Sequence, residues 1–506
     1  MPAARGTTAP SATRAYLEGL LPEGRALETA ASRLRGVELD SAGAPAAPSD
    51  AVALLAEYGR ECAGAVVVAP AGSGPPGGGH PSSPLGEVEL ADLVRNLPTN
   101  PLGADPGREI RMSLRGAQDK LLLTRVAGNW CRPIDGYPST HILKPTSVWP
   151  HSAKNEALVL SLSRACGLSS NDVWIEQIAD TSVLVTERYD RITGDDGSVH
   201  RLHQEDMCQA AGVRPKDKYL IGRPSDRMTR VLREFAASPI REALAVYRQV
   251  AFRALVGDED GHGRNYSSVH TDGGVTAAPL YDSLCTLAYP DLSGTMGAQI
   301  GTQRSLAKVD RQALAEEARA MGIPAVAAAE AIDELIDNVR SGAADLSPTL
   351  TEGWPAERII ETILGRAQRL ESDQPLGGAK PSSPRGLWMR PLSDGVASEG
   401  SRPLGHVPAL SRLQVDTELP RTAGSRHLHQ GQLGVVELGQ HRGLLLHLSH
   451  GRVDAALQSL GVGVTPLGVA DQAGSHHADH QVDPDARISG HTPVWPDDAN
   501  TGAGRF

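Results

Sequence analysis

The order in which two hydrophobic patterns follow one another is the feature that most restricts the fold of this chain. Residues 110–187 are mostly strand-like, with apolar or β-branched runs at 121–123, 140–144, 173–178 and 183–186. One helix is expected inside this region, from Asn155 to Cys166, because Gly167 is a typical helix terminator. Beyond residue 224 the spacing is helical, over 225–237, 241–256, 311–321, 325–339 and 355–370. A β-rich N-lobe followed by an α-helical C-lobe predicts an α+β fold.

Composition excludes several classes of protein. The chain has 506 residues and a net charge of -11, and 40% of its residues are hydrophobic, enough for a large core. No run approaches the roughly 20 apolar residues of a membrane-spanning helix, and residues 1–14 do not resemble a secretory signal. The five cysteines are scattered, unlike those of a disulfide framework. We therefore expect a cytoplasmic protein without membrane contact, and the acidic balance disfavours nucleic-acid binding by this chain itself.

Residues 371–506 differ from the rest in composition. They hold one lysine, one isoleucine and ten of the 17 histidines. Apart from 444–448 and 453–460, they lack the apolar periodicity of a packed domain. We expect a largely disordered, low-order tail, and a shifted reading frame is an alternative origin of the same composition break.

Three polar residues have the spacing of a phosphoryl-transfer site. Asn265 follows Asp260 by five residues, and Asp282 comes after the next strand-like segment. Phosphoryl transfer needs a carboxylate that accepts the hydroxyl proton and oxygen ligands that hold Mg²⁺. The spacing parallels the catalytic-loop Asp and Asn of protein kinases and their later metal-binding Asp. The alternative is an acidic, glycine-rich surface loop with an unrelated aspartate at a strand end.

Three upstream segments would complete such a site. Residues 116–120 (GAQDK) precede a strand, where backbone amides would cradle phosphate oxygens, although most such loops are plain hairpins. Lys144 ends a strand and Glu156 lies near the start of the next helix, which is how kinases hold an ammonium on the phosphates. Residues 184–190 stand between the lobes, as a nucleotide hinge does; the alternative is an edge strand with a salt bridge.

Taken together, these segments resemble the successive motifs of the HipA family. The resemblance runs in order from about residue 16 to 370. Its motifs are SLRGAQDK at 113–120, THILKP at 140–145, NEA at 155–157, VTERYDR at 185–191, RLHQEDMCQ at 201–209, GDEDGHGRN at 257–265 and PLYD at 279–282. HipA proteins are bacterial serine/threonine-protein kinases that act as toxins of type II toxin-antitoxin pairs.

The resemblance implies a role for each matching residue. Asp260 would be the base, and Asn265 and Asp282 would hold Mg²⁺. The residues covering the phosphates of ATP would be Arg115, Gly116, Ala117, Gln118, Asp119, Lys120 and Lys144; those of the hinge Glu187, Arg188 and Tyr189; and those beside the nucleotide Gln204, His262 and Tyr281. Ser113 matches a serine that family members phosphorylate on themselves to switch off, and its phosphate would drive the segment outward.

The resemblance also gives expected domain boundaries. These are a HipA N-terminal-like subdomain at 1–105, whose first strands have no counterpart before Tyr16, a nucleotide-binding N-lobe at 106–192, a helical catalytic C-lobe at 193–370 and the tail at 371–506. The family pattern is broken at a few positions. Arg264 and Gln299 stand where lysine is common. Asp258 and Glu259 add carboxylates where the family usually has uncharged residues, and this charge would either raise the pKa of Asp260 or draw a metal ion out of position.

The expected activity, by resemblance, is ATP- and Mg²⁺-dependent phosphorylation of a protein serine or threonine, with an aminoacyl-tRNA synthetase as a candidate substrate. The expected partner is a small helix-turn-helix antitoxin, through which DNA would be contacted only indirectly. Two alternatives stay open. One is a catalytically weak pseudokinase that acts as a co-repressor with the antitoxin. The other is a small-molecule phosphotransferase, because antibiotic kinases share the Asp-to-Asn spacing.

Overall fold

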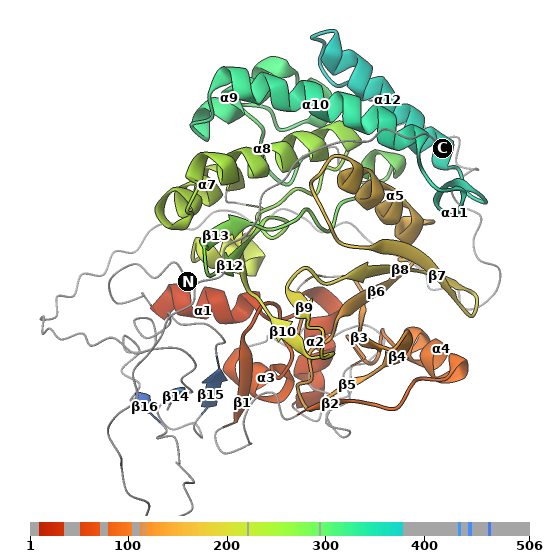
Figure 1. Ribbon diagram of the computed structural model, residues 1–506, viewed down its shortest axis with the longest axis vertical. Coiled ribbons are helices and arrows are strands. Elements are labelled where there is room, and N and C mark those ends of the chain that lie inside the picture. The colour runs from red at the N-terminus through yellow and green to blue at the C-terminus, as the bar shows by residue number, and fades with distance from the viewer. Residues whose placement is uncertain are drawn as a thin grey trace, which may run out of the picture. The chain divides into compact units, whose positions relative to one another are not determined.

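The computed structural model describes residues 10–34, 51–70, 79–103 and 112–377, apart from 115, 117, 220, 221, 293 and 294, and the backbone of three later strands. Figure 1 shows the helices and strands of these residues, coloured from the N-terminus to the C-terminus. The helices are α1 (Pro10–Gly19), α2 (Gly24–Leu34), α3 (Ala51–Tyr58), α4 (Glu87–Arg95), α5 (Ser152–Ala165), α6 (Met207–Ala210), α7 (Pro224–Phe235), α8 (Pro239–Val256), α9 (Arg311–Ala320), α10 (Ala325–Ala344), α11 (Pro348–Thr351) and α12 (Ala356–Glu371).

The strands fall into several small sheets. Their bounds are β1 (Val67–Pro70), β2 (His80–Pro81), β3 (Leu121–Val126), β4 (Asn129–Cys131), β5 (Pro133–Ile134), β6 (His141–Pro145), β7 (Val173–Ile178), β8 (Thr181–Glu187), β9 (Arg191–Thr193), β10 (Val199–Arg201), β11 (His203–Asp206), β12 (Ser267–Thr271), β13 (Gly274–Ala277), β14 (Gly434–Val436), β15 (Leu444–His447) and β16 (Val464–Pro466). The α+β class expected from the hydrophobic pattern is confirmed.

The largest sheet has five antiparallel strands in the order β4-β3-β6-β8-β7. Its strands are those that the β-branched and apolar runs predict. Leu121, Leu123, Leu143 and Val185 point into a core that also contains residues of α4, so α4 covers this face. The register places Lys144 opposite Leu184, near the end of β6.

Helix α5 packs on the other side of this sheet, against β7 and β8 (Figure 1). Ala153 and Ala157 of the helix contact Leu184 of β8, and all three side chains are fully buried. Small side chains let the helix approach the strand closely, which brings its first turn to the end of β6. The structure begins α5 at Ser152, three residues before the expected start.

The helical lobe is built around α8. This helix is buried along most of its length and contributes Val246, Tyr247 and Phe252 to a core shared with α7, α9, α10 and α12. It ends at Gly257, whose φ of 80° is a left-handed conformation that glycine adopts without strain. The chain therefore turns directly from the buried helix into the segment that contains Asp260.

Helices α2 and α4 and most of one sheet are among the elements that were not expected from the sequence. Helix α2 has no counterpart among the expected helices, and its Ala, Thr and Ser side chains are buried by packing rather than by a strong apolar stripe. Helix α4 was not anticipated either. Strands β11, β12 and β13 form an antiparallel sheet inside the lobe expected to be helical, where the sequence indicated only one strand-like segment, between Asn265 and Asp282. They are short and rich in His, Ser and Thr, so they carry little hydrophobic signal.

Most of the expected tail lies outside the described residues. Within it, β14, β15 and β16 join β1 in a sheet of order β1-β15-β14-β16. Strand β15 coincides with the apolar exception at 444–448 and pairs antiparallel with β1. Among the described helices, none has the length and apolar character needed to cross a bilayer.

Candidate active site

Lys144 links the five-stranded sheet to the helical lobe. Its Nζ atom lies 2.7 Å from Oε1 of Glu156 on α5 and 2.7 Å from Oδ1 of Asp282. Burial alone would lower the pKa of Lys144, but the two carboxylates outweigh it and hold the pKa well above its usual value. Burial is likewise outweighed at Asp282, whose pKa Lys144 holds well below its usual range. The expected Lys144–Glu156 pair is present, and both Lys144 and Asp282 are charged at neutral pH.

Asp260 lies at the start of the loop between α8 and β12. Its side chain is 53% exposed, and Tyr219 donates a hydrogen bond of 3.2 Å to Oδ1. The pKa of Asp260 is raised to about 7, first because surrounding protein displaces water from the carboxyl group, and then because Asp258 and Asp282 lie nearby. An accessible carboxyl group that titrates near neutrality matches what a general base requires.

Asn265 is tied to Asp260 through the backbone. Its Nδ2 atom donates to the carbonyl oxygen of Asp260 over 2.8 Å, and the amide of His262 donates to the same oxygen over 2.7 Å. The ring of His262 is buried and contacts that of Tyr219 edge-on, with centroids 5.2 Å apart. Burial lowers the pKa of His262 to about 3, so the imidazole is neutral at pH 7.

Arg253 of α8 holds this loop and the Asp282 segment together. Its guanidinium donates to the carbonyl oxygens of Asn265 (3.1 Å), Tyr281 (2.6 Å) and Asp282 (3.0 Å), and it pairs with the carboxylate of Asp258. The arginine is 2% exposed. Sequence reasoning missed this residue, although an arginine within the otherwise apolar stretch 250–256 was a signal that could have found it.

The 116–120 segment lies close to Lys144. Lys120 is buried, its Nζ atom donates to the carbonyl oxygen of Gln118 over 2.8 Å, and burial together with nearby Lys144 lowers its pKa to about 8. Gly116 has a φ of 109°, and a Cβ atom there would approach Lys120 Nζ to 2.8 Å. Asp119 is half-buried, and Arg115 and Ala117 lie outside the described residues. The loop therefore places the ammonium group of Lys120 near that of Lys144 on β6.

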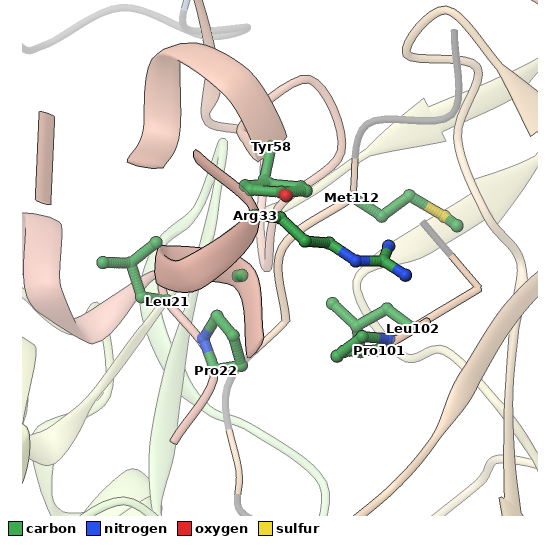
Figure 2. A pocket seen from close by; sticks show the side chains of 8 residues that line it. Leu21, Pro22, Arg33, Tyr58, Pro101, Leu102 and Met112 are labelled. Atoms are coloured by element: carbon green, nitrogen blue, oxygen red, sulfur yellow. The ribbon is translucent and has the colours of Figure 1, made fainter. Parts of the chain in front are cut away.

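Ser113 is fully buried beneath the N-terminal helices. Its amide donates to the carbonyl oxygen of Glu61 over 2.8 Å, and its hydroxyl donates to that of Leu20 over 2.8 Å. Figure 2 shows the small pocket beside this segment, which Met112 lines together with Tyr58, Leu21 and Arg33 of the N-terminal region. In this conformation the hydroxyl is not accessible to any kinase.

The expected hinge residues separate into two groups. Tyr189 forms a hydrogen bond with Gln204, and its ring lies 5.5 Å from that of Tyr281, so these three side chains are together. The hydroxyl of Tyr281 also lies 2.7 Å from the carbonyl oxygen of Arg264. Glu187 is exposed, and its amide already donates to the carbonyl oxygen of Asp172 over 3.0 Å.

Arg188 turns away from this group into a buried ion cluster. Its guanidinium binds Asp190 and Glu61, and Arg191 and Arg201 approach the Glu61 carboxylate to 2.8 and 2.6 Å. Burial alone would raise the pKa of Glu61, but the three guanidinium groups lower it to about 2. Sequence reasoning did not assign Glu61 a role; the cluster joins the N-terminal region to the end of the sheet.

Two family models match the chain. The HipA-like C-terminal domain matches residues 112–343, and the HipA N-terminal domain matches residues 1–69, so together they cover more than half of the sequence. The chain belongs to the HipA family. The match at 112–343 contains the described site from Ser113 to Asp282, and the match at 1–69 contains the helices that cover Ser113.

Relatives of this HipA-family chain carry names of kinases. A protein of Sinorhizobium fredii named "Putative kinase Y4mE" is 36% identical over 370 residues, which are 70% of this chain and 84% of the relative. The serine/threonine-protein kinase toxin HipA of Shewanella oneidensis is 26% identical over 336 residues, 63% of this chain and 73% of that protein.

A solved structure shares the fold. HipA of Shewanella oneidensis, solved with HipB and its operator DNA, matches with a TM-score of 0.60 at 22% identity, over 72% of this chain and 87% of that one. The two-lobed HipA fold, with its kinase-like architecture, is therefore the fold of this chain.

Proposed function

We propose that this HipA-family protein is an ATP- and Mg²⁺-dependent serine/threonine protein kinase. The observation that carries the proposal is the bridge from Glu156 through Lys144 to Asp282, with distances of 2.7 Å on both sides. Protein kinases need a strand lysine paired with a helix glutamate next to a metal-binding aspartate. Asp260 and Asn265 lie on the loop that Arg253 joins to Asp282.

The donor groups fit a hard divalent cation. Asp282 is ionised and its side chain is 44% exposed, and the amide nitrogen of Asn265 is used within the loop, which leaves its carbonyl oxygen for a metal. Oxygen ligands of this kind suit Mg²⁺, and Asn265 and Asp282 would hold it. When bound, Mg²⁺ neutralises phosphate charge.

The remaining residues take roles in binding and proton transfer. Asp260 orients the substrate hydroxyl and accepts its proton while the γ-phosphoryl group moves to the hydroxyl oxygen and ADP leaves. Lys144 and the 116–120 loop bind phosphate oxygens. The full set assigned to ATP is Arg115, Gly116, Ala117, Gln118, Asp119, Lys120, Lys144, Glu187, Arg188, Tyr189, Gln204, His262 and Tyr281. Arg188 would contribute only through its carbonyl oxygen, because its side chain is used in the ion cluster and its amide donates to the carbonyl oxygen of Thr140.

Ser113 is the proposed site of self-inactivation. Ser113 is buried beside Leu20, so its phosphorylation requires the segment to become exposed first. The phosphoserine, with a charge of about -2, would then prevent the segment from refolding into the buried position.

The proposed partners are suggested by the named relatives. The Shewanella oneidensis protein was solved with HipB and operator DNA, which supports a small helix-turn-helix antitoxin as partner, with DNA contacted through it. We propose a cytoplasmic location and an aminoacyl-tRNA synthetase as the substrate class. Co-expression with a neighbouring antitoxin and co-purification of the two chains would test the partnership.

The deciding experiment is incubation of the purified chain with γ-labelled ATP and Mg²⁺. Label on the chain itself or on an added protein supports the proposal. Label only on a small molecule would favour the phosphotransferase alternative. If no phosphate is transferred but the chain still binds the antitoxin, the result would favour the alternative of a pseudokinase that acts as a co-repressor.

A further inference from the structure

Three potential metal ligands meet on one face of the sheet formed by β11, β12 and β13. His203 and His270 are directly opposite each other in the antiparallel register of β11 and β12. Glu205 follows His203 by two residues, so the alternation of side chains along a strand places it on the same face. The two imidazole rings lie 4.8 Å apart between centroids, and one ligand atom from each of the three residues lies within 4.8 Å of the others.

The surroundings of these groups favour a bound cation. Glu205 is fully buried, and His203 and His270 are partly buried. His203 Nδ1 and His270 Nε2 are buried ring nitrogens without a hydrogen-bond partner among the residues that the structure describes. Buried polar atoms are normally satisfied, and an exception calls for a water or an ion.

The contact between His203 and Glu205 does not by itself account for the arrangement. His203 Nε2 lies 3.5 Å from Oε1 of Glu205, whereas a charge-assisted hydrogen bond between such groups is typically about 2.7–2.9 Å long. The His203–Glu205 pair also gives no role to His270. Two imidazoles and one carboxylate are instead a ligand set that zinc prefers.

We propose that His203, Glu205 and His270 bind a divalent transition-metal ion of the zinc type. In a tetrahedral site with bonds of about 2.0–2.2 Å, ligand atoms are about 3.3 Å apart, so metal binding requires these three ligand atoms, which now lie within 4.8 Å of one another, to move closer by side-chain rotation. Three protein ligands leave a coordination position for water. The site differs from the all-oxygen pair Asn265 and Asp282, which suits magnesium.

The location indicates a structural role. Glu205 is followed by Asp206, which caps α6 and binds Arg264 over 3.1 Å, and β12 begins two residues after Asn265. A metal ion there would join the strands on both sides of the proposed catalytic loop and stabilise the folded loop. This inference does not depend on the proposed kinase activity.

The experiment uses the full chain, stripped with a chelator and then equilibrated with zinc chloride. Bound zinc is counted by atomic absorption after gel filtration. Because ten histidines of the 371–506 segment are a second source of zinc binding, the count is compared with that of a double variant, His203→Ala with His270→Ala. The matched control is His200→Ala, which removes an exposed histidine of neighbouring β10.

We expect the double variant to bind one zinc ion fewer than the wild type and the control. Zinc should raise the melting temperature of the wild type by roughly 3 °C or more and leave that of the double variant unchanged. Glu205→Gln, which preserves side-chain size, should weaken zinc binding at least about tenfold; circular dichroism in chelator checks that each variant is folded. Equal zinc counts and equal thermal shifts in wild type, Glu205→Gln and the double variant would overturn the proposal.

Discussion

At the scale of single residues, the proposed chemistry depends on the carboxyl group of Asp260. Asp260→Asn should reduce phosphoryl transfer about 10²- to 10⁴-fold, because an amide does not accept the hydroxyl proton. Folding should be unaffected, since the side chain is half-exposed and receives one hydrogen bond, from Tyr219. Transfer of labelled phosphate and a thermal melt measure the two effects. A variant with the wild-type rate would remove Asp260 from the mechanism.

Arg253 is a positioning residue whose loss should affect both activity and stability. Arg253→Lys keeps the charge, but a single ammonium cannot reach the carbonyl oxygens of Asn265, Tyr281 and Asp282 together. We expect kcat to fall roughly 10- to 100-fold with the loop displaced. The free energy of unfolding should fall by about 3 kcal/mol, because one ammonium group cannot replace all the hydrogen bonds that the guanidinium gives to the Asp258 carboxylate and the buried carbonyl oxygens.

Urea unfolding and a kinase assay with saturating ATP test the Arg253 prediction. Arg248→Lys is the matched control, since Arg248 lies on the same helix and forms a more exposed pair with Glu334. Wild-type kcat and stability in Arg253→Lys would show that the loop is held by other contacts.

At the scale of elements, the packing of residues 112–114 beneath the N-terminal helices controls access to Ser113. Ser113→Ala should abolish self-phosphorylation and leave ATP binding intact, so its expression should be more toxic to cells than that of the wild type. The lost hydrogen bond to Leu20 should cost only about 1 kcal/mol. Mass spectrometry after incubation with ATP and a growth assay measure the outcome.

Ser163→Ala is the control for the Ser113 variant, because it removes another fully buried hydroxyl, which donates to the carbonyl oxygen of Leu160 on α5. Equal toxicity of Ser113→Ala and wild type, with no phosphate on wild-type Ser113, would contradict the regulatory role.

At the scale of the whole molecule, the Glu61 cluster couples the N-terminal region to the five-stranded sheet. The pKa of Glu61 is lowered from 4.5 to about 2 in the folded state. Such a carboxylate stabilises the fold fully above pH 4.5, and that stability is lost as the pH falls toward 2. The shift corresponds to a contribution on the order of 3 kcal/mol at neutral pH.

Melting temperatures of wild type and Glu61→Gln between about pH 7 and pH 3 test this contribution. The wild type should lose stability more steeply than the variant below pH 4.5, and the difference between them should narrow as the pH falls. Parallel curves over this range would show that Glu61 is not the titrating group.

The helical lobe extends slightly beyond the expected boundary at residue 370. Leu376 is fully buried, and its amide donates to the carbonyl oxygen of Val309 over 2.7 Å. Arg366 also donates to the carbonyl oxygen of Gly377 over 2.7 Å. Truncation after Gly377 should therefore leave ATP binding and transfer within a few fold of wild type, whereas truncation after Leu370 should lower the melting temperature.

Expression of both truncated chains, with thermal melts and transfer assays, tests this boundary. Deletion of residues 378–506 also removes β15, the antiparallel partner of β1. Loss of activity in the chain truncated after Gly377 would show that the pairing of β1 with β15 is required.

The sequence alone determined the elements with strong local patterns and the order of the motifs. Long apolar runs predict β3, β6, β7 and β8, and the Lys144–Glu156 pair could be anticipated because strand and helix are adjacent in the chain. The residues of the proposed site were named from family motifs, whose spacing is itself a sequence property.

Only the tertiary structure decided which distant groups meet. Arg253 reaches Asp282 across 29 residues, Glu61 reaches Arg191 across 130, and His203 faces His270 across two short polar strands. Each contact depends on packing between elements, and no local pattern encodes the partner of a buried charge or the register of two strands without an apolar face. Helix α2 could not be predicted for the same reason: it is helical because its small side chains pack against α3.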